Sequence, residues 1–186
     1  MEVVFNSFLI VALSEMGDKT QLLAFILASR FKKPWPVFWG IFVATLLNHA
    51  LAAWAGEWVS SFIPPAYLKY GLAAIFIAFA IWVLIPDKVD DELKPLGRNA
   101  FLTTTFMFFL AEMGDKTQLA TVALSARYHN LVLVTLGTTL GMMLSNGAAV
   151  FFGDKMAAKI SMIWMHRFAA LFFIIFAIGA LITLPG

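Results

Sequence analysis

Hydrophobic residues form six long runs that are separated by short polar segments. The runs cover residues 3–29, 35–56, 70–85, 99–126, 131–153 and 168–184. Most approach or exceed the ~20 apolar residues that an α-helix needs to cross a bilayer. They are much longer than the ~10 residues of a membrane β-strand, and they do not alternate between apolar and polar residues. The pattern therefore predicts an all-α integral membrane protein with six transmembrane helices.

Composition supports a membrane protein and narrows its chemistry. The chain is 61% hydrophobic and 13% charged, whereas a soluble domain is about 45–50% apolar and about 25% charged. The net charge of +2 comes from basic residues in short loops, which favours orientation in a lipid bilayer over binding to nucleic acid. The absence of cysteine excludes disulfides and thiolate metal sites. No basic region precedes the first run, so we expect that run to be a retained helix rather than a signal peptide.

The first and fourth runs are interrupted by the same eight residues. The string EMGDKTQL occurs at residues 15–22 and again at residues 112–119, an offset of 97. Gly137 follows Gly40, and Arg127 follows Arg30, at the same offset. The repeated unit therefore contains three helices. We predict a first repeat at residues 1–86, a polar linker at 87–97 and a second repeat at 98–186, which together form one transport domain.

An odd number of helices in each repeat fixes the relative orientation of the repeats. If the first helix crosses the membrane in one direction, the fourth must cross in the other, so the halves are inverted repeats. The loops on one side of the membrane contain nine lysine and arginine residues, and those on the other side contain two, Lys69 and Arg127. The positive-inside rule places the rich side in the cytoplasm and both termini outside. The nine are Arg30, Lys32, Lys33, Lys88, Lys94, Arg98, Lys155, Lys159 and Arg167.

Both copies of the motif place ionisable side chains near the middle of an apolar run. Charged groups at that depth are costly, which makes them candidates for function. On a continuous helix, Glu15 and Asp18 share one face, Gln21 continues it, and Lys19 can reach the Glu15 carboxylate. Gly17 and its repeat either allow close helix packing or mark a break in the helix. The metal-binding candidates are Glu15, Asp18, Glu112 and Asp115.

The charge of this cluster suggests what it binds. Four carboxylates and two ammonium groups, those of Lys19 and Lys116, give −4 + 2 = −2 if all are ionised. One divalent cation would neutralise that charge, and oxygen ligands suit Mg²⁺, Ca²⁺ and Mn²⁺. An empty carboxylate cluster in low dielectric must take up protons, so protons and metal compete for the same oxygens. The sequence predicts metal:proton exchange, with two protons per ion as a hypothesis.

Other polar residues are weaker candidates for lining the site. For six of them the alternative is hydrogen bonding between helices, and for Lys19 and Lys116 it is a fixed structural ion pair. Asn48 and Asn146 lie at similar depths, although their offset is 98. His49 is a candidate for proton relay or a packed histidine. The six residues are Thr20, Gln21, Asn48, Thr117, Gln118 and Asn146.

The doubled E-x-G-D-K-T motif in a six-helix chain resembles the Ca²⁺/Mn²⁺: H⁺ exchanger family. That family includes Golgi manganese/calcium transporters and small bacterial manganese exporters of the MneA type. The resemblance covers essentially the whole chain and implies a cation/proton antiporter, not an enzyme, without a bound cofactor. It carries the metal-binding role to Glu15, Asp18, Glu112 and Asp115. The short chain is similar to bacterial members, which implies export of Mn²⁺, with Ca²⁺ as the second candidate, across the bacterial inner (plasma) membrane.

Alternating access would rock one three-helix repeat against the other around the fixed site. A passive divalent-cation channel is the alternative, because inverted repeats do not exclude it. An intramembrane enzyme lacks a recognisable nucleophile and base in this sequence, and a scaffold does not explain the doubled charged motif. A homo-oligomer is compatible with the sequence.

Overall fold

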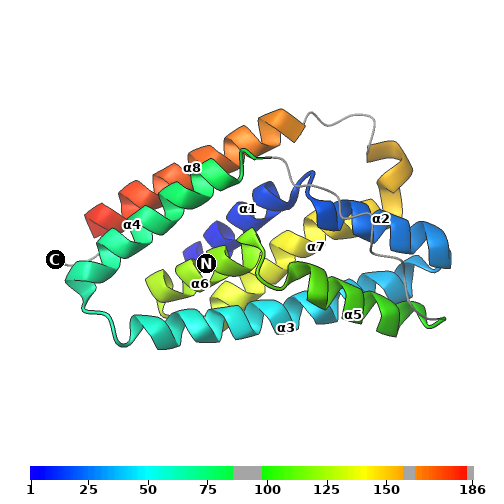
Figure 1. Cartoon of the computed structure of the whole chain (residues 1–186), viewed down its shortest axis with the longest axis horizontal. Coiled ribbons are helices and arrows are strands. Elements are labelled where there is room, and N and C mark those ends of the chain that lie inside the picture. The colour runs from blue at the N-terminus through cyan, green and yellow to red at the C-terminus, as the bar shows by residue number, and fades with distance from the viewer. Residues whose placement is uncertain (86–97, 157–161, 184–186) are drawn as a thin grey trace.

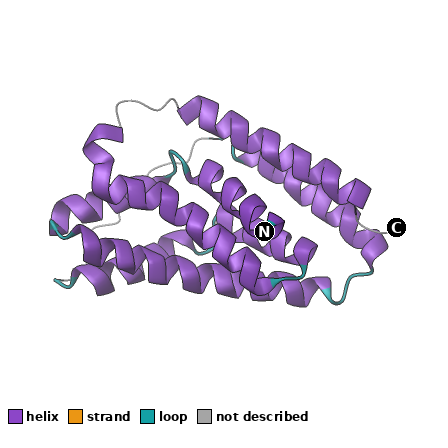
Figure 2. Cartoon of the chain, turned by 180° about the vertical axis from the view of Figure 1, so that it is seen from behind, coloured by secondary structure: helices purple, strands orange, loops and turns teal. Residues whose placement is uncertain are grey.

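The structure, a computed structural model, describes residues 1–85, 98–156 and 162–183, and these residues form eight helices and no strand (Figures 1 and 2). The helical prediction is thus confirmed for this part of the chain. The predicted linker at 87–97 lies outside it. The helices are α1 (Glu2–Glu15), α2 (Lys19–Phe31), α3 (Pro34–Ser60), α4 (Pro65–Trp82), α5 (Ala100–Glu112), α6 (Lys116–Tyr128), α7 (Leu131–Met156) and α8 (Met162–Thr183).

In the described part of the chain, the six predicted runs correspond to eight helices, because two of the runs are broken. The first and fourth hydrophobic runs are each split at the repeated motif, into α1 and α2 and into α5 and α6. The other four runs are single helices whose ends lie within about six residues of the predicted ones. By length and composition, α3 and residues 131–152 of α7 can cross a bilayer without interruption.

Most of the packing joins one half of the chain to the other. The long helices α3 and α7 pack against each other, α1 lies along α7, and α5 and α6 follow each other along α3 (Figure 1). By contrast, α4 has no extensive contact with the other helices of its own half. The two repeats therefore interdigitate instead of forming two separate compact units.

Equivalent close contacts recur on both sides of this interdigitated bundle. A Cβ atom added to Gly40 on α3 would lie 2.8 Å from Thr104 Cβ on α5. A Cβ atom added to Gly137 on α7 would lie 2.8 Å from Ser7 Cβ on α1. Each residue in one contact differs by 97 from its counterpart in the other (40 and 137, 104 and 7). A two-fold rotation that exchanges the halves produces this kind of reciprocal contact.

Helices α4 and α8 form a pair along one side of the bundle (Figure 1). Their shared surface contains phenylalanines in reciprocal contacts. The ring centroids of Phe76 and Phe176 are 5.7 Å apart, and those of Phe79 and Phe173 are 5.6 Å apart. As a unit, the pair packs more extensively on α1 and α6 than on α2 and α5. The pair is thus symmetric within itself but placed asymmetrically on the rest of the bundle.

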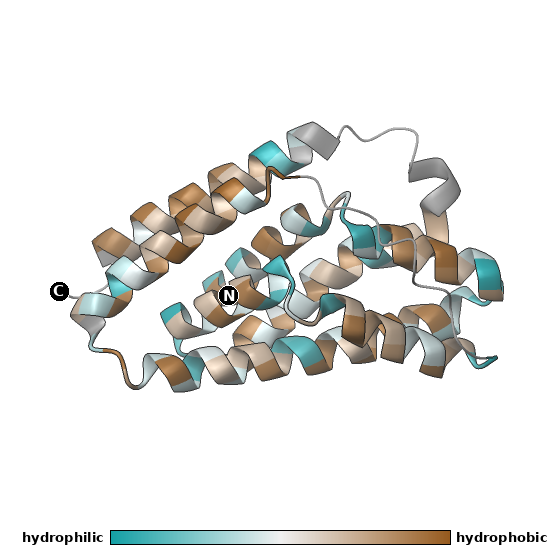
Figure 3. Ribbon diagram, viewed as in Figure 1, coloured by the Kyte–Doolittle hydropathy of each residue, from teal (hydrophilic) through white to brown (hydrophobic). Residues whose placement is uncertain are grey.

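The outer surface is apolar, and much of the polar character lies inside. In Figure 3, brown apolar segments cover most helices, while teal polar segments lie around the break between α1 and α2 and at several helix ends. Trp35, Trp39, Trp54 and Trp58 on α3 are each at least half exposed. Many serine and threonine side chains of the helices are buried. Large exposed apolar areas are typical of a surface that faces lipid.

We predict that Gly56→Ala destabilises the fold, because its Cβ would lie 2.2 Å from the carbonyl oxygen of Val122 on α6. Overpacking of this kind costs about 1–3 kcal/mol. The matched control is Gly71→Ala in α4, where nothing lies within 4 Å of the added Cβ. Thermal unfolding in detergent should show a lower midpoint for the first variant and an unchanged or higher one for the second. An unfolding midpoint of Gly56→Ala equal to that of Gly71→Ala would contradict the close contact between α3 and α6.

Candidate metal centre

Each helix break is built around a glycine with a positive φ angle. Gly17 has φ +87° and Gly114 has φ +79°, a region that other residues rarely adopt. The next residue, Asp18 or Asp115, has extended backbone angles and is the N-cap of the following helix. Glycine after one helix and aspartate before the next form a stop and start signal. The Gly-Asp pair in the motif therefore accounts for both breaks.

A glutamine of the motif stabilises each break from the following helix. The Gly17 N–H donates to Gln21 Oε1 at 3.0 Å, and the Gly114 N–H donates to Gln118 Oε1 at 2.6 Å. Both glutamines thus satisfy a backbone donor that the broken helix leaves without an intrahelical partner. Among the described residues, the two glutamines serve the backbone of the break.

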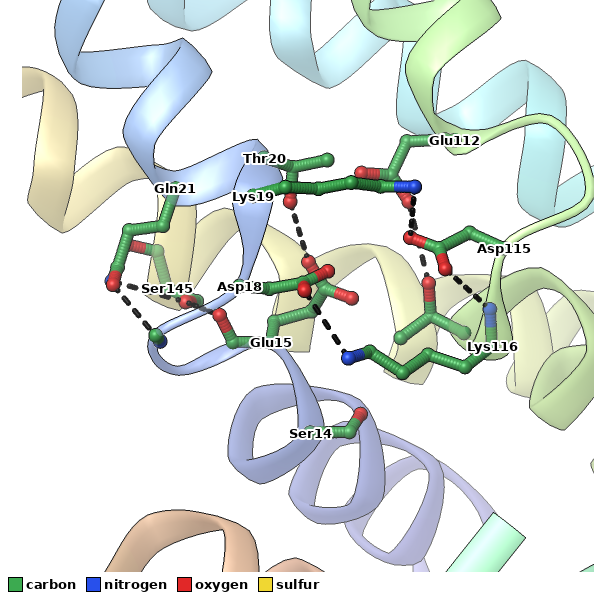
Figure 4. Close-up of polar contacts among 12 residues, drawn as sticks. Ser14, Glu15, Asp18, Lys19, Thr20, Gln21, Glu112, Asp115, Lys116 and Ser145 are labelled. Atoms are coloured by element: carbon green, nitrogen blue, oxygen red, sulfur yellow. Dashed lines mark hydrogen bonds and ion pairs between the residues drawn. The ribbon is translucent and has the colours of Figure 1, made fainter. Parts of the chain in front are cut away.

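The breaks change how the charged side chains meet. Glu15 ends α1 and Asp18 precedes α2, so the prediction that they share one continuous helical face is wrong. Lys19, which on a continuous helix could reach the Glu15 carboxylate, forms its ion pair with Asp115 instead. Lys19 Nζ lies 3.6 Å from Asp115 Oδ2, and Lys116 Nζ lies 3.1 Å from Asp18 Oδ1 (Figure 4). Each lysine therefore pairs with the aspartate of the opposite repeat.

The two glutamates lie in the interior and are oriented by threonines. Thr20 Oγ1 donates to Glu15 Oε2 at 2.9 Å, and Thr117 Oγ1 donates to Glu112 Oε2 at 3.3 Å. Both glutamates are at most 1% exposed. Within the described parts of the chain, the second oxygen of each, Oε1, is buried and accepts no hydrogen bond. Each glutamate thus keeps one oxygen available to a proton or a metal ion.

Carboxylates from both repeats converge on one place. One oxygen from each of Glu15, Glu112 and Asp115 can be chosen so that all three lie within 4.8 Å of one another. Asp18, the fourth predicted ligand, lies outside this group of three and is ion-paired with Lys116. Oxygens on opposite sides of a bound Ca²⁺ ion lie about 4.6–5.2 Å apart. The cluster can accordingly coordinate a divalent cation with little rearrangement.

The crossed ion pairs divide the charge of the cluster. The two aspartates are matched by the two lysines, which leaves the two glutamates as the excess charge of −2 when they are ionised. One divalent cation or two protons would bring the glutamate pair to neutrality. A charge in a low-dielectric interior must be compensated. In charge, one divalent cation and two protons are therefore equivalent compensations for the glutamate pair.

Ser145 on α7 is a component of the site that the sequence analysis did not identify. Its hydroxyl donates to the Glu15 carbonyl at 3.0 Å, and Gln21 Nε2 donates to the Ser145 carbonyl at 3.2 Å. Ser145 thereby connects α7 to both ends of the first break. Its signal was the spacing Gly137, Gly141, Ser145 on the face of α7 that packs on α1.

Asn48 and Asn146 are buried but lie in different environments. Asn48 Nδ2 donates to the carbonyl of Phe109, three residues before Glu112, whereas Asn146 Nδ2 contacts Met142 Sδ at 2.8 Å within α7. The offset of 97 pairs Asn48 with Ser145 and His49 with Asn146, so the two asparagines are not repeat mates. His49 is 1% exposed, and neither ring nitrogen has a hydrogen-bond partner among the described residues.

Comparison with known proteins identifies related transporters. The chain matches the sequence profile of the family described as "Divalent cation/proton antiporter GDT1" over residues 3–91 and 100–185. These two segments correspond closely to the two repeats. The profile match covers most of the chain and describes transporters rather than enzymes.

Individual relatives extend over nearly the whole chain. A protein of Vibrio cholerae described as "Putative manganese exporter" is 46% identical over 180 residues, which cover 96% of this chain and 90% of the relative. "GDT1-like protein sll0615" of Synechocystis is 29% identical over 192 residues, covering 91% of this chain and 92% of the relative. "GDT1-like protein 3" of Arabidopsis thaliana is 28% identical over 210 residues, which cover 96% of this chain and 70% of the relative. No solved structure matches the chain significantly.

We predict that backbone conformation, and not space, restricts position 114. Nothing lies within 4 Å of a Cβ atom added to Gly114, yet its φ is +79°. Gly114→Ala should therefore destabilise the protein by about 1–2 kcal/mol. Gly114→Asn should cost less, although asparagine is larger, because asparagine tolerates positive φ. Thermal unfolding of the two variants provides the measurement, and a more stable alanine variant would contradict the described break.

Proposed function

Because the chain belongs to the GDT1 family of divalent cation/proton antiporters, we propose that it exports Mn²⁺ from the cytoplasm in exchange for protons. The observation that carries this proposal is the convergence of Glu15, Glu112 and Asp115 from two repeats onto one buried place. Asp18 completes the proposed metal site, with Lys19 and Lys116 as the counter-ions of the two aspartates. Thr20 and Thr117 orient the glutamates, and both glutamines stabilise the breaks.

Exchange follows from the charge of the glutamate pair. A Mn²⁺ ion that enters the site replaces two protons, and two protons that return displace the ion, so the site is close to neutral in both loaded states. A site that must be loaded in either state cannot return empty without a large electrostatic cost. Coupling between cation and proton movement would therefore arise from the site itself, with two protons per divalent cation as the proposed stoichiometry.

The preference for Mn²⁺ rests on the donor set and on the relatives. Carboxylate oxygens suit Mg²⁺, Ca²⁺ and Mn²⁺, and the spacing of the three converging oxygens admits an ion as large as Ca²⁺. The Vibrio cholerae relative is described as a manganese exporter. We assign Mn²⁺ as the main substrate and Ca²⁺ as the second. Met113 is 56% exposed, so its thioether is not part of the proposed donor set.

The proposed membrane arrangement is a pair of inverted three-helix repeats in the bacterial inner membrane. Each broken run, α1–α2 or α5–α6, would count as one span, which gives six spans with α3, α4, α7 and α8. Reciprocal contacts of Gly40 with α5 and of Gly137 with α1 support a two-fold relation between the repeats. The excess of basic residues in the loops on one side supports cytoplasmic placement of that side, with both termini outside.

Alternating access explains the burial of the site better than a passive channel does. The four motif carboxylates are each at most 5% exposed. A conducting channel needs a continuous water-filled path past its ion site, whereas a transporter passes through states in which the site is closed. The site would then open to one side of the membrane at a time.

Neutralising one carboxylate of the site should abolish transport. We expect Glu15→Gln and Asp115→Asn to reduce Mn²⁺ uptake into proteoliposomes at least about 100-fold while leaving insertion intact. Glu15→Gln removes a charge that balances the cation, and Asp115→Asn removes a ligand and leaves the Lys19 ammonium unmatched beside the site. The control is Glu2→Gln, which removes an exposed carboxylate near the start of α1. Normal transport by either site variant would refute the assignment of the site.

Proton coupling should be visible in liposomes that contain a pH dye. An outward Mn²⁺ gradient should drive protons in the opposite direction, and an imposed pH gradient should accumulate Mn²⁺ against its own gradient. Parallel assays with Ca²⁺, Mg²⁺ and Zn²⁺ measure selectivity. Mn²⁺ flux that ignores the pH gradient and only runs downhill would favour the channel instead.

A further inference from the structure

The asymmetry of the α4–α8 pair indicates which part of the molecule moves. The pair is held together by reciprocal phenylalanine contacts, so it is symmetric within itself. Its packing on the bundle is not symmetric, because it favours α1 and α6 over their repeat mates, α5 and α2. Two similar halves can exchange their conformations at little cost, since each contact of one half has a counterpart in the other. The same pair could therefore pack on α2 and α5 in a second state.

Arg127 fixes the pair in its present position. It lies in the last turn of α6, and its Nη1 donates to the Phe176 carbonyl of α8 at 3.0 Å. Its guanidinium lies 4.9 Å from the centroid of the Phe176 ring and 5.4 Å from that of Tyr128. Gly179 leaves room for it, since an added Cβ would lie 3.0 Å from Nη2. Asn6 of α1 donates to the Tyr128 hydroxyl at 2.9 Å, which ties α1 to the same end.

The repeat mate of Arg127 makes no such contact here. Arg30 lies in the last turn of α2, is exposed, and has no hydrogen bond, ion pair or aromatic contact with any residue that the structure describes. The offset of 97 assigns Phe79 of α4 as the counterpart of Phe176. The first repeat has Trp82 at the position equivalent to Gly179. In an equivalent contact, Arg30 would therefore stack on the indole ring of Trp82, whereas Arg127 occupies the space beside Gly179.

We propose that Arg127 and Arg30 are alternate gate residues on the two ends of the bundle. In the described conformation Arg127 holds the α4–α8 pair against α1 and α6. In the opposite conformation the pair tilts toward α2 and α5, the Arg127 contact is broken, and Arg30 donates to the Phe79 carbonyl. That carbonyl already accepts from the Val83 N–H at 2.9 Å and has a second lone pair for Arg30. This inference rests on the proposed alternating access.

The moving body would then be the α4–α8 pair, which contains one helix from each repeat. The sequence analysis expected one three-helix repeat to rock against the other. The contacts fit that division poorly, because α1 lies along α7, and α5 and α6 lie along α3. Separating the halves would break these extensive interfaces, whereas tilting the pair exchanges one set of contacts for an equivalent set. The metal-binding motifs would stay with the six remaining helices.

The test uses a single cysteine as a reporter, since the chain contains none. Ala126 of α6 is buried in the core cluster that it shares with Ala180 of α8, whereas its repeat mate, Ser29 of α2, is exposed, so the exchange of conformations should expose position 126. Ala126→Cys is reconstituted in lipid nanodiscs, which leave both faces in contact with buffer, and its reaction rate with a charged maleimide is measured. Arg127→Gln should raise that rate about tenfold, because the described conformation loses a hydrogen bond from a charged group. Arg30→Gln, the matched control, should lower it by stabilising the described conformation relative to the other.

The combined Arg127→Gln and Arg30→Gln variant separates gating from misfolding. Because each conformation then lacks one contact, the rate should return toward that of the reporter alone, which damage to the fold would not produce. Ala123→Cys serves as a second reporter, because Ala123 is buried and its repeat mate, Ile26, is 40% exposed. An unchanged rate in Arg127→Gln, a faster one in Arg30→Gln, or a double variant as fast as Arg127→Gln would overturn the proposal. Labelling needs neither metal nor a pH gradient, so its outcome is distinguishable from failure of Mn²⁺ transport.

Discussion

The crossed ion pairs between the two helix breaks organise this protein. Lys116 reaches Asp18 at 3.1 Å and Lys19 reaches Asp115 at 3.6 Å, so each repeat neutralises the aspartate of the other. The Lys116–Asp18 pair is buried, whereas the Lys19 side chain is 28% exposed. Breaking a buried pair typically costs about 3–5 kcal/mol, so the Lys116–Asp18 pair ties the two halves together at their centre. The pairing also leaves Glu15 and Glu112 without an ion pair of their own among the described residues. The same interaction thus provides the attachment of the repeats and the excess charge that a cation can match.

The breaks make this pairing geometrically possible. A continuous helix would direct Glu15 and Asp18 along one face of one repeat, whereas the change of direction at Gly17 lets Asp18 face Lys116. At the first break, the exposed backbone groups are satisfied by Gln21 of α2 and by Ser145 of α7. A membrane interior tolerates an interrupted helix only where such partners are supplied. The polar residues of the motif therefore have two tasks, which are to support the break and to provide the site.

Much of this arrangement could be predicted from the sequence. The hydrophobic runs indicated an all-helical protein, and the offset of 97 indicated the repeat and the residues that recur in its contacts. The division of the first and fourth runs was foreseen only as one of two options for Gly17, although the Gly-Asp pair is a known stop and start signal. Ser145 was missed although its spacing from Gly137 and Gly141 places it on one face of α7, because its role depends on the approach of α7 to the end of α1. The crossed pairing of the lysines also depends on tertiary packing, which helical spacing cannot reveal.

The central claim is that two protons and one divalent cation compete for the glutamate pair. Isothermal titration of Mn²⁺ into the purified protein, in buffers that differ in ionisation enthalpy, counts the protons released by each bound ion. The account predicts binding at one site with a proton release that approaches two as the pH is lowered, and Glu15→Gln should reduce that number. Mn²⁺ binding whose heat is the same in every buffer at every pH would contradict it.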